Sequence, residues 1–475
     1  MKMINTLRRF MVAGAIALLS LTSCLDVEPE SAIPTDEAMA TYEEAEQTLT
    51  GIYALLKSSA LYSGYLTLLP DIQADLVYAI DGYSNQYGSF WLWQLRSTTA
   101  EVESVYAGLY SVISNCNFFL ENINEVKANT IDDAKLSDLD YFTGEVYAMR
   151  ALAYSELIKC YCKAYDPATA KGYSAKEEAV RASLYDSYQM VLSDLAMAEE
   201  LLDEEYDGYS AIYTTKAMAE ALHARVALYM QDWETAADYS SRVIDHPNKV
   251  YSLSSATTLY TSDMSFFDYM WAHDLSTEAI WQIGFTQTSF GGALGSVFLN
   301  FTTDYYNFYP DYVPAQWVLD LYDAGDRRYE AYFYDAQTGY DHALQWPLLV
   351  KYYGNRDFIS SSYIYHVTMP KPFRLAEQYL IRAEAYCRQQ TPNFTAATED
   401  IMTLRKARYV SGGSLSLKKD NFIEEIANER VRELYMEGFR LHDIKRWGSL
   451  YRNGEGFTRV PQQQSLSEGS SISVK

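Results

Sequence analysis

The sequence predicts a mainly α-helical fold in which helical repeats carry an irregular, loop-rich subdomain with a few short strands. Three observations lead to this fold class. Apolar residues recur at helical spacing along both flanks of the 475-residue chain. Between about 250 and 369 this pattern gives way to short apolar runs and glycine-rich turns. In some of the helical segments, small residues return at intervals that let a neighbouring helix approach closely.

Several segments have the spacing of helices, most of them on the flanks of the chain. The first begins at Thr41, which precedes Glu44 by the three residues of a capping box. The predicted helices cover about 41–57, 99–123, 135–163, 183–202, 215–231, 233–244, 373–388, 395–409 and 421–447.

The helix expected at 215–231 is apolar on two sides. One stripe consists of Ala217, Ala221, Ala224 and Leu228, and the other of Met218, Leu222, Val226 and Tyr229. A helix of this kind is packed on two sides. Trp233, Ala236 and Ala237 follow at spacings that resemble the second half of a tetratricopeptide repeat, and a similar arrangement returns around 383–404. Because the repeats are degenerate, a mixed helical bundle remains the alternative.

The middle third of the chain has a different pattern of apolar residues, without helical spacing. Residues 278–283 form an apolar run typical of a strand, and the glycines of 291–295 indicate a loop. Shortly afterwards Tyr305, Tyr306 and Tyr309 crowd around Pro310. That aromatic density is unusual for a loop without a binding role.

The N-terminus has the features of an export signal. Lys2, Arg8 and Arg9 precede an apolar run over 10–21, which is too short to span a membrane. The run ends in Leu-Thr-Ser-Cys, an order similar to the bacterial lipobox, in which cleavage leaves the cysteine first and acylated. We therefore expect Cys24 to carry lipid. The alternative is an ordinary signal peptide that contains a cysteine by chance.

Charge and cysteine content exclude several classes of function. A formal net charge of -25, with no basic face, argues against a nucleic-acid partner. The four remaining cysteines are too few for a disulfide framework, and we expect all of them to be small buried apolar residues. The six histidines do not pair with cysteines or carboxylates at ligand spacing, so no metal or other cofactor is expected.

Two C-terminal segments are long enough to indicate a family. Residues 374–386 read RLAEQYLIRAEAY, and residues 426–448 read IANERVRELYMEGFRLHDIKRWG. Both resemble the signature helices of the SusD/RagB family of outer-membrane nutrient-binding lipoproteins. The positions in register in the second segment are Glu429, Arg430, Glu433, Leu434, Glu437, Gly438, Arg440, Asp443, Arg446 and Trp447.

The resemblance implies a SusD-like division of the chain. A lipoprotein signal peptide (1–23) and an acidic tether (24–40) would precede a helical repeat part (41–249). A loop-rich variable subdomain (250–369) would then lead to a C-terminal helical repeat with the family-signature helix (370–475). The exported chain would be held at the outer membrane, on the cell surface, by its acylated cysteine.

The resemblance also implies a function without covalent chemistry. Family members capture an oligosaccharide or polysaccharide at the cell surface for a SusC-like TonB-dependent outer-membrane transporter. The resemblance therefore predicts a glycan ligand, a transporter partner and no enzymatic activity. The alternatives are a peptide-binding importer of the same fold, a glycoside hydrolase and a purely structural surface protein.

A sugar ring binds by laying its apolar face on an aromatic side chain while polar groups meet its hydroxyls. Two candidate surfaces of this kind are Trp91 with Trp93, and the cluster of Tyr305, Tyr306 and Tyr309. The alternative for each is a buried aromatic residue. Because the two tryptophans alternate with Phe90 and Leu92, we expect one of them to face the core.

Carboxylates in the signature helix invite a catalytic interpretation, since glycan hydrolysis requires paired acids. Glu433, Glu437 and Asp443 alternate with arginines at helical spacing. We therefore predict a structural ion network, with Glu429 meeting Arg432 or Arg430 meeting Glu433 three residues along the helix. No catalytic residue is expected.

Overall fold

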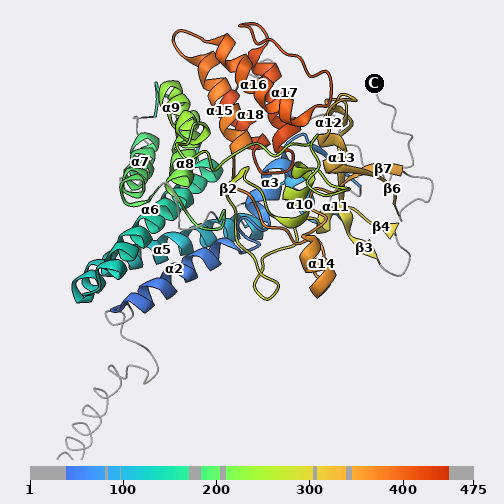
Figure 1. Cartoon of the computed structure of the whole chain (residues 1–475). Helices are drawn as coiled ribbons and strands as arrows, with labels where there is room; N and C mark the ends of the chain where they lie inside the picture. The colour runs from blue at the N-terminus through green and yellow to red at the C-terminus, as the bar shows by residue number, and fades with distance from the viewer. Residues whose placement is uncertain are drawn as a thin grey trace, which may run out of the picture.

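The computed structural model describes residues 39–80, 84–96, 98–170, 183–203, 210–302, 307–338 and 345–448. Helices build the N-terminal part, and the longer ones among them lie on the left in Figure 1, with α3 near the centre. They are α2 (Tyr42–Leu56), α3 (Tyr65–Gln73), α4 (Gly88–Trp91), α5 (Ala100–Asn129), α6 (Asp133–Tyr161), α7 (Leu184–Leu201), α8 (Lys216–Tyr229) and α9 (Trp233–Ile244).

The predicted capping box opens α2. The Thr41 hydroxyl accepts a hydrogen bond from the Glu44 N–H at 3.3 Å, and the Glu44 carboxylate accepts one from the Thr41 N–H at 2.9 Å. Each bond satisfies a backbone donor that the first helical turn leaves free. The predicted start of the first helix is therefore confirmed, whereas α3 and the short α4 were not predicted.

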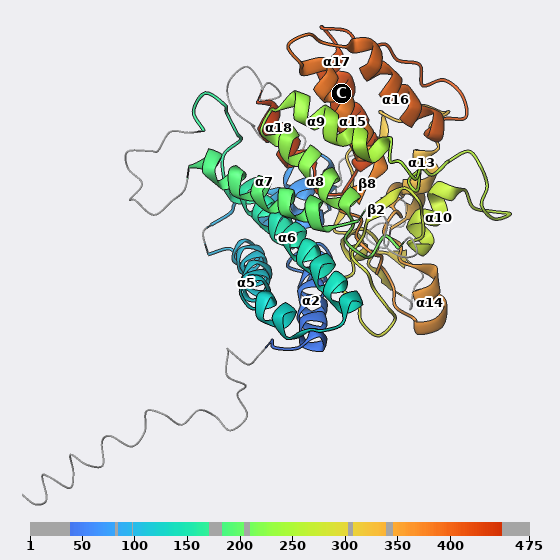
Figure 2. The same cartoon turned by 60° about the vertical axis from the view of Figure 1, so that its left-hand side comes forward.

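The helical repeats continue across the middle of the chain. Helix α9 packs against α8 and also against α15 (Leu375–Arg388), which in turn packs against α16 (Phe394–Arg408). Ala224, Ile381 and Ala385 meet in this contact and are buried. The helices lie side by side in both views (Figures 1 and 2). This packing of successive helices confirms the prediction of tetratricopeptide-like repeats. Small residues at the contacts allow the helices to approach closely.

The loop-rich part contains short helices and two-stranded antiparallel sheets. The helices are α10 (Phe266–His273), α11 (Ser296–Leu299), α12 (Gln316–Leu319), α13 (Arg328–Tyr332) and α14 (Arg356–Ser362). The strand pairs are β1 (Val77–Ala79) with β5 (Tyr312–Pro314), β2 (Ala279–Trp281) with β8 (Phe373–Arg374), β3 (Phe301–Thr302) with β4 (Asn307–Phe308), and β6 (Phe333–Gln337) with β7 (Gln345–Leu349).

Strand pairing joins this subdomain to both flanks. β1 comes from the N-terminal flank, and β8 comes from the C-terminal flank. Strand pairing therefore crosses both expected boundaries, at about 250 and 369, and the division itself stays a prediction. The strand expected at 278–283 is confirmed as β2, where Trp281 is fully buried.

The signature segment is not one helix. The prediction of a continuous helix over 421–447 is wrong, because α17 (Phe422–Leu434) and α18 (Arg440–Trp447) are separated by a turn. Gly438 has a φ of 84° in this turn, in the left-handed region that glycine tolerates best. The buried Asp71 carboxylate accepts the N–H groups of Gly438 at 3.0 Å and Arg440 at 2.8 Å. It thereby caps the start of α18.

The cysteines follow the expectation only in part. Cys116 and Cys387 are buried, Cys160 is partly buried and Cys162 is exposed. The prediction that all four cysteines are buried is wrong for Cys162. This residue follows the last residue of α6, where the chain leaves the helical core. Within the described ranges, every helix is too short or too polar to traverse a lipid bilayer.

Candidate ligand-binding site

The two aromatic segments that the sequence singled out lie next to each other. Strands β1 and β5 pair directly, with Tyr78 opposite Val313. Beyond the strands, the Asn85 amide donates to Asp311 Oδ1 at 2.9 Å, and the Tyr312 hydroxyl donates to the Gln86 carbonyl at 2.6 Å. The loop that carries the tryptophans is therefore held against the loop that ends the tyrosine-rich run.

Trp91 cannot present its ring to a ligand. It is 2% exposed, and its indole N–H donates to the Val77 carbonyl at 3.2 Å. Its ring packs in the hydrophobic core of the loop-rich part. The assignment of Trp91 to a sugar-binding surface is therefore corrected: one of the two tryptophans faces the core, as the alternation suggested, and Trp91 is that residue.

Trp93 lies at the surface with 37% of its area exposed. Its indole N–H donates to the Gln73 carbonyl at 2.6 Å, which fixes the edge of the ring. Trp317 donates in the same way to the Asp75 carbonyl at 2.7 Å. Trp91 donates to the Val77 carbonyl, so three indole N–H groups bind the carbonyls of residues 73, 75 and 77, between the end of α3 and the start of β1. This arrangement holds the Trp93 ring in a defined position.

Only one of the three candidate tyrosines can be described. Tyr305 and Tyr306 lie outside the described residues. Tyr309 is partly buried, and its backbone N–H donates to the Asn300 carbonyl at 3.1 Å. The chain therefore folds back beside the short hairpin β3–β4, and Tyr309 leads directly into Asp311 and β5.

The two segments that carry Trp93 and Tyr309 also supply polar groups to the site. Burial raises the pKa of Asp311, against the opposing hydrogen bonds from the Asn85 side chain and the Gln86 backbone. Burial also raises the pKa of Tyr87 to about 12, so its hydroxyl is neutral and can donate or accept. The Tyr87 ring meets Tyr65 edge to face, with centroids 5.7 Å apart. Amide, carboxyl and phenol groups next to an aromatic ring can recognise a polyhydroxylated ligand without covalent chemistry.

The sequence did not single out Tyr65, Tyr87 or Asp311. Tyr87 belongs to the same aromatic-rich segment as Trp93, so aromatic density alone contained a signal for it. Tyr65 and Asp311 join the site only through the packing of α3 and the pairing of β1 with β5.

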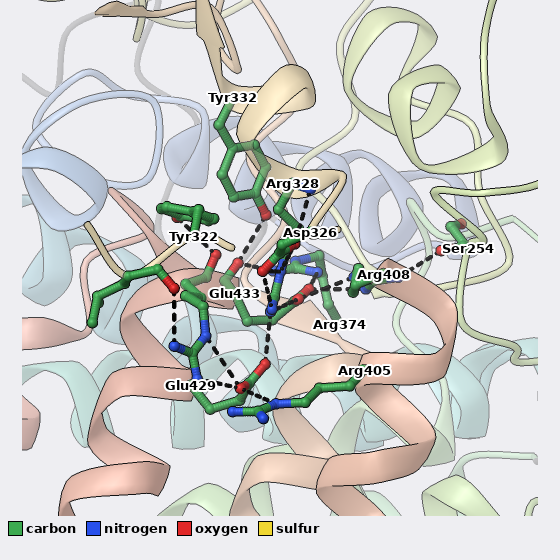
Figure 3. Close-up of polar contacts among 12 residues, drawn as sticks. Ser254, Tyr322, Asp326, Arg328, Tyr332, Arg374, Arg405, Arg408, Glu429 and Glu433 are labelled. Carbon is green, nitrogen blue, oxygen red and sulfur yellow. Dashed lines mark hydrogen bonds and ion pairs between the residues drawn. The ribbon is translucent and has the colours of Figure 1, made fainter. Parts of the chain in front are cut away.

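The carboxylates of the signature segment form a buried ion network instead of an acid pair (Figure 3). Glu433 binds Arg374 and Arg408 at 2.9 Å and Arg328 at 3.0 Å. Glu429 binds Arg405 and Arg432 at 2.7 Å and Arg328 at 2.8 Å. Both glutamates are fully buried, so neither carboxylate can reach a bound glycan.

The pairing within the signature segment was predicted only in part. The pair of Glu429 with Arg432 is confirmed. Arg430 does not bind Glu433 and instead binds Asp443 at 2.6 Å, because the turn after α17 brings α18 back against it. Sequence spacing along one continuous helix could not anticipate this contact.

The arginines keep these acids ionised. Burial alone would raise the pKa of Glu384, but Arg446 and Arg388 outweigh it and lower that pKa to about 2. The same balance of burial against Arg328, Arg432 and Arg405 holds the pKa of Glu429 far below its usual range. A permanently charged, fully paired carboxylate is a poor proton donor, which favours a structural role.

Two hollows elsewhere in the described part of the chain differ from this site. A cavity of about 30 Å³ is enclosed between Tyr62, Glu156, Arg225 and Lys371. A groove of about 520 Å³ runs along α16 beside Met402, Lys406 and Tyr409. Neither is lined by Trp93 or Tyr309.

Two family models match the chain. One, described as "SusD family", matches residues 298–473, and the other, described as "Starch-binding associating with outer membrane", matches residues 24–228. This chain belongs to the SusD family. The expectation from the two C-terminal segments is therefore confirmed.

Relatives in the SusD family extend along nearly the whole chain. The SusD-like protein P25 of Formosa agariphila is 22% identical over 91% of this chain and 88% of its own length. The starch-binding protein SusD of Bacteroides thetaiotaomicron is 35% identical, over 25% of this chain and 20% of its own length.

Solved structures support the SusD-like fold. A SusD superfamily protein from Bacteroides thetaiotaomicron has a TM-score of 0.71 and 21% identity, covering 86% of this chain and 89% of its own. A putative sugar binding protein from Bacteroides vulgatus has a TM-score of 0.68 and 22% identity, covering 86% and 88%. At this identity the likeness concerns the fold.

Proposed function

We propose that this SusD-family chain is a glycan-binding lipoprotein of the outer-membrane surface that captures an oligosaccharide or polysaccharide for a SusC-like TonB-dependent transporter. The observation that carries the proposal is the position of Trp93. Its partly exposed ring, fixed by the Gln73 carbonyl, lies in the loop that Asn85 and Asp311 hold against the tyrosine-rich segment. Relatives described as starch-binding and sugar binding support a carbohydrate as the ligand.

The mechanism is non-covalent recognition followed by release to the partner. The Trp93 ring would accept the apolar face of a sugar, while Tyr87, Asn85 and Asp311 would exchange hydrogen bonds with its hydroxyls or order the groups that do. No step forms or breaks a bond in the ligand. The buried and paired state of Glu429 and Glu433 supports a role without hydrolysis.

Replacing Trp93 by alanine should weaken glycan binding by about 1–3 kcal/mol, because a stacked ring supplies a large part of the contact. A glycan array identifies the ligand, and calorimetry on the purified protein then measures the loss. Trp317→Phe is the matched control, because it removes an indole N–H bond to the same segment without removing an exposed ring. Equal affinity of Trp93→Ala and wild type would place the binding surface elsewhere.

We further propose that Cys24 anchors the exported chain, since the family match begins at this residue and the preceding segment has the features of a lipoprotein signal. A Cys24→Ala variant should be exported but should leave the membrane fraction, because a lipid anchor supplies the attachment. Cell fractionation followed by immunoblotting measures this, with Cys162→Ala as the control. Retention of Cys24→Ala at the membrane, in cells that lack the transporter, would contradict the anchor.

A further inference from the structure

Three tyrosines form an exposed aromatic cluster on α5 and α6, apart from the site at Trp93. Tyr106 and Tyr110 lie one turn apart on α5, and Tyr161 is the last residue of α6. The ring centroids of Tyr106 and Tyr110 are 4.6 Å apart, and Tyr161 meets Tyr106 edge to face at 5.4 Å. Their exposed fractions are 47%, 42% and 40%. We call this cluster the tyrosine platform.

The rings of the tyrosine platform are held in place without a ligand. The Tyr161 hydroxyl donates to the Val102 carbonyl at 2.6 Å. A hydrogen bond with Tyr106 and burial together raise the pKa of Tyr110 to about 12, so the Tyr110 hydroxyl stays neutral. Ordered side chains lose little conformational entropy on binding, and large exposed rings that are already ordered suit a binding surface.

Hydrogen-bonding groups flank these rings along α5. Glu103 lies three residues before Tyr106, and Ser114 lies four residues after Tyr110, so helical spacing puts them on the same face. Both residues are exposed. The face therefore offers aromatic carbon at its centre with a carboxylate and hydroxyls at its ends. This is the chemistry that a sugar chain requires, since its rings have apolar faces and its hydroxyls both donate and accept.

Helical spacing separates the tyrosine platform from Glu101, at the start of α5. Glu101 lies near Tyr65 and Tyr87, because its charge adds to the burial that raises the pKa of both tyrosines. Tyr106 follows Glu101 by five residues, which places it about 140° further around the helix at 100° per residue. We therefore expect a short oligosaccharide at Trp93 to leave the tyrosine platform untouched, and a long chain to reach it around the start of α5.

A second exposed patch, near α10, has by contrast the aliphatic composition expected of a protein contact. Phe266 begins α10, Leu259 and Tyr260 precede that helix and Leu275 follows it, and the two leucines are 62% and 61% exposed. Exposed aliphatic side chains suit protein partners. Among the described residues, no large aliphatic side chain is comparably exposed next to Tyr106, Tyr110 and Tyr161. The composition of the tyrosine platform therefore favours a carbohydrate.

We propose that the tyrosine platform is a second glycan-binding surface, which engages another stretch of the polysaccharide bound at Trp93. The proposal rests on the proposed function and narrows it to a polymeric ligand. Two weak contacts on one chain reinforce each other, because the second forms within the complex at a high effective concentration. The protein should consequently prefer a polysaccharide to its own short oligosaccharides.

The test compares polymer and short oligomer on the same variants. Affinity electrophoresis in amylopectin, xylan, galactomannan and laminarin identifies the retained polysaccharide, and calorimetry with its trisaccharide measures the Trp93 site alone. Tyr106→Ala and Tyr161→Ala should each weaken polysaccharide binding about tenfold and leave trisaccharide binding unchanged. Tyr106→Phe retains the ring and should bind as wild type. Tyr334→Ala, which alters a tyrosine that is 61% exposed on β6, is the matched control.

Each of the other outcomes contradicts either the tyrosine platform or the proposed function. Wild-type retention of polysaccharide by Tyr106→Ala and Tyr161→Ala overturns the tyrosine platform and leaves the Trp93 site intact. Loss of trisaccharide and polysaccharide binding together with a lowered melting temperature assigns the tyrosines to the structure, which also overturns it. Unchanged polysaccharide binding with loss of the co-purifying transporter identifies a protein contact instead. Failure of the wild type to bind any of the four polysaccharides overturns the proposed function itself.

Discussion

Replacing Glu433 by alanine should lower the free energy of unfolding by about 3–5 kcal/mol. Glu433 is shared by Arg328, Arg374 and Arg408, all of which are buried. Without it, each of these three desolvated guanidinium groups loses an ionic partner. Since domains are stable by only about 5–15 kcal/mol, the loss is a large fraction of the total. Urea unfolding followed by circular dichroism measures it.

An exposed ion pair supplies the control for this prediction. Glu330 of α13 binds Arg327, the residue before that helix, at 2.7 Å, and both side chains are exposed. Glu330→Ala should therefore change stability by less than about 1 kcal/mol. If Glu433→Ala were equally mild, the buried network would contribute little net stability. If Glu433→Ala does not fold, Glu433→Gln, which retains volume and one acceptor, should show a smaller loss in the same assay.

Replacing Gly438 by alanine should cost about 2–4 kcal/mol, the second largest effect expected here. Its φ of 84° is unfavourable for any residue with a Cβ atom. A Cβ atom there would also collide with the Leu66 carbonyl oxygen, which belongs to α3 and cannot swing aside. The strain would displace the Gly438 N–H from Asp71 and uncap α18. A fall in melting temperature reports the loss.

A helical glycine with free space around it is the natural comparison. Gly51 lies within α2, and a Cβ atom added there meets nothing within 4 Å. Gly51→Ala should therefore stabilise the protein by about 1 kcal/mol, since alanine favours the helix. A Gly438→Ala variant that melts no lower than wild type would mean that the turn between α17 and α18 can relax into another conformation.

Local pattern accounts for the parts of the fold that were predicted. Helix α9 begins and ends where the sequence places it, at Trp233 and Ile244, because its cap and its apolar stripe are encoded within one short segment. Helix α3 was missed because Pro70 interrupts its pattern, although the helix tolerates that proline. The break between α17 and α18 was missed because a single glycine, Gly438, was its main local signal.

The candidate site was predictable only as two separate pieces. Aromatic density is a local property, so it pointed to Trp93 and to the tyrosines before Pro310. The contact between the pieces depends on pairing β1 with β5, which lie far apart along the chain. The clustering of the tyrosine platform was not predicted for the same reason, since Tyr106 and Tyr161 meet only when α5 and α6 pack.

The packing of α9 against α15 also has a consequence for the order in which the chain folds. Most repeat proteins can propagate structure from each repeat to the next one synthesised. Here the partner of α9 arrives only after the whole loop-rich part has been made, and Glu433 arrives later still. Contacts so distant in sequence form slowly, because the entropy of closing a long loop is lost before the contact energy is gained. A nascent chain that ends before α15 exposes the alanine-rich face of α8 and α9, and is the stage at which aggregation is most to be expected.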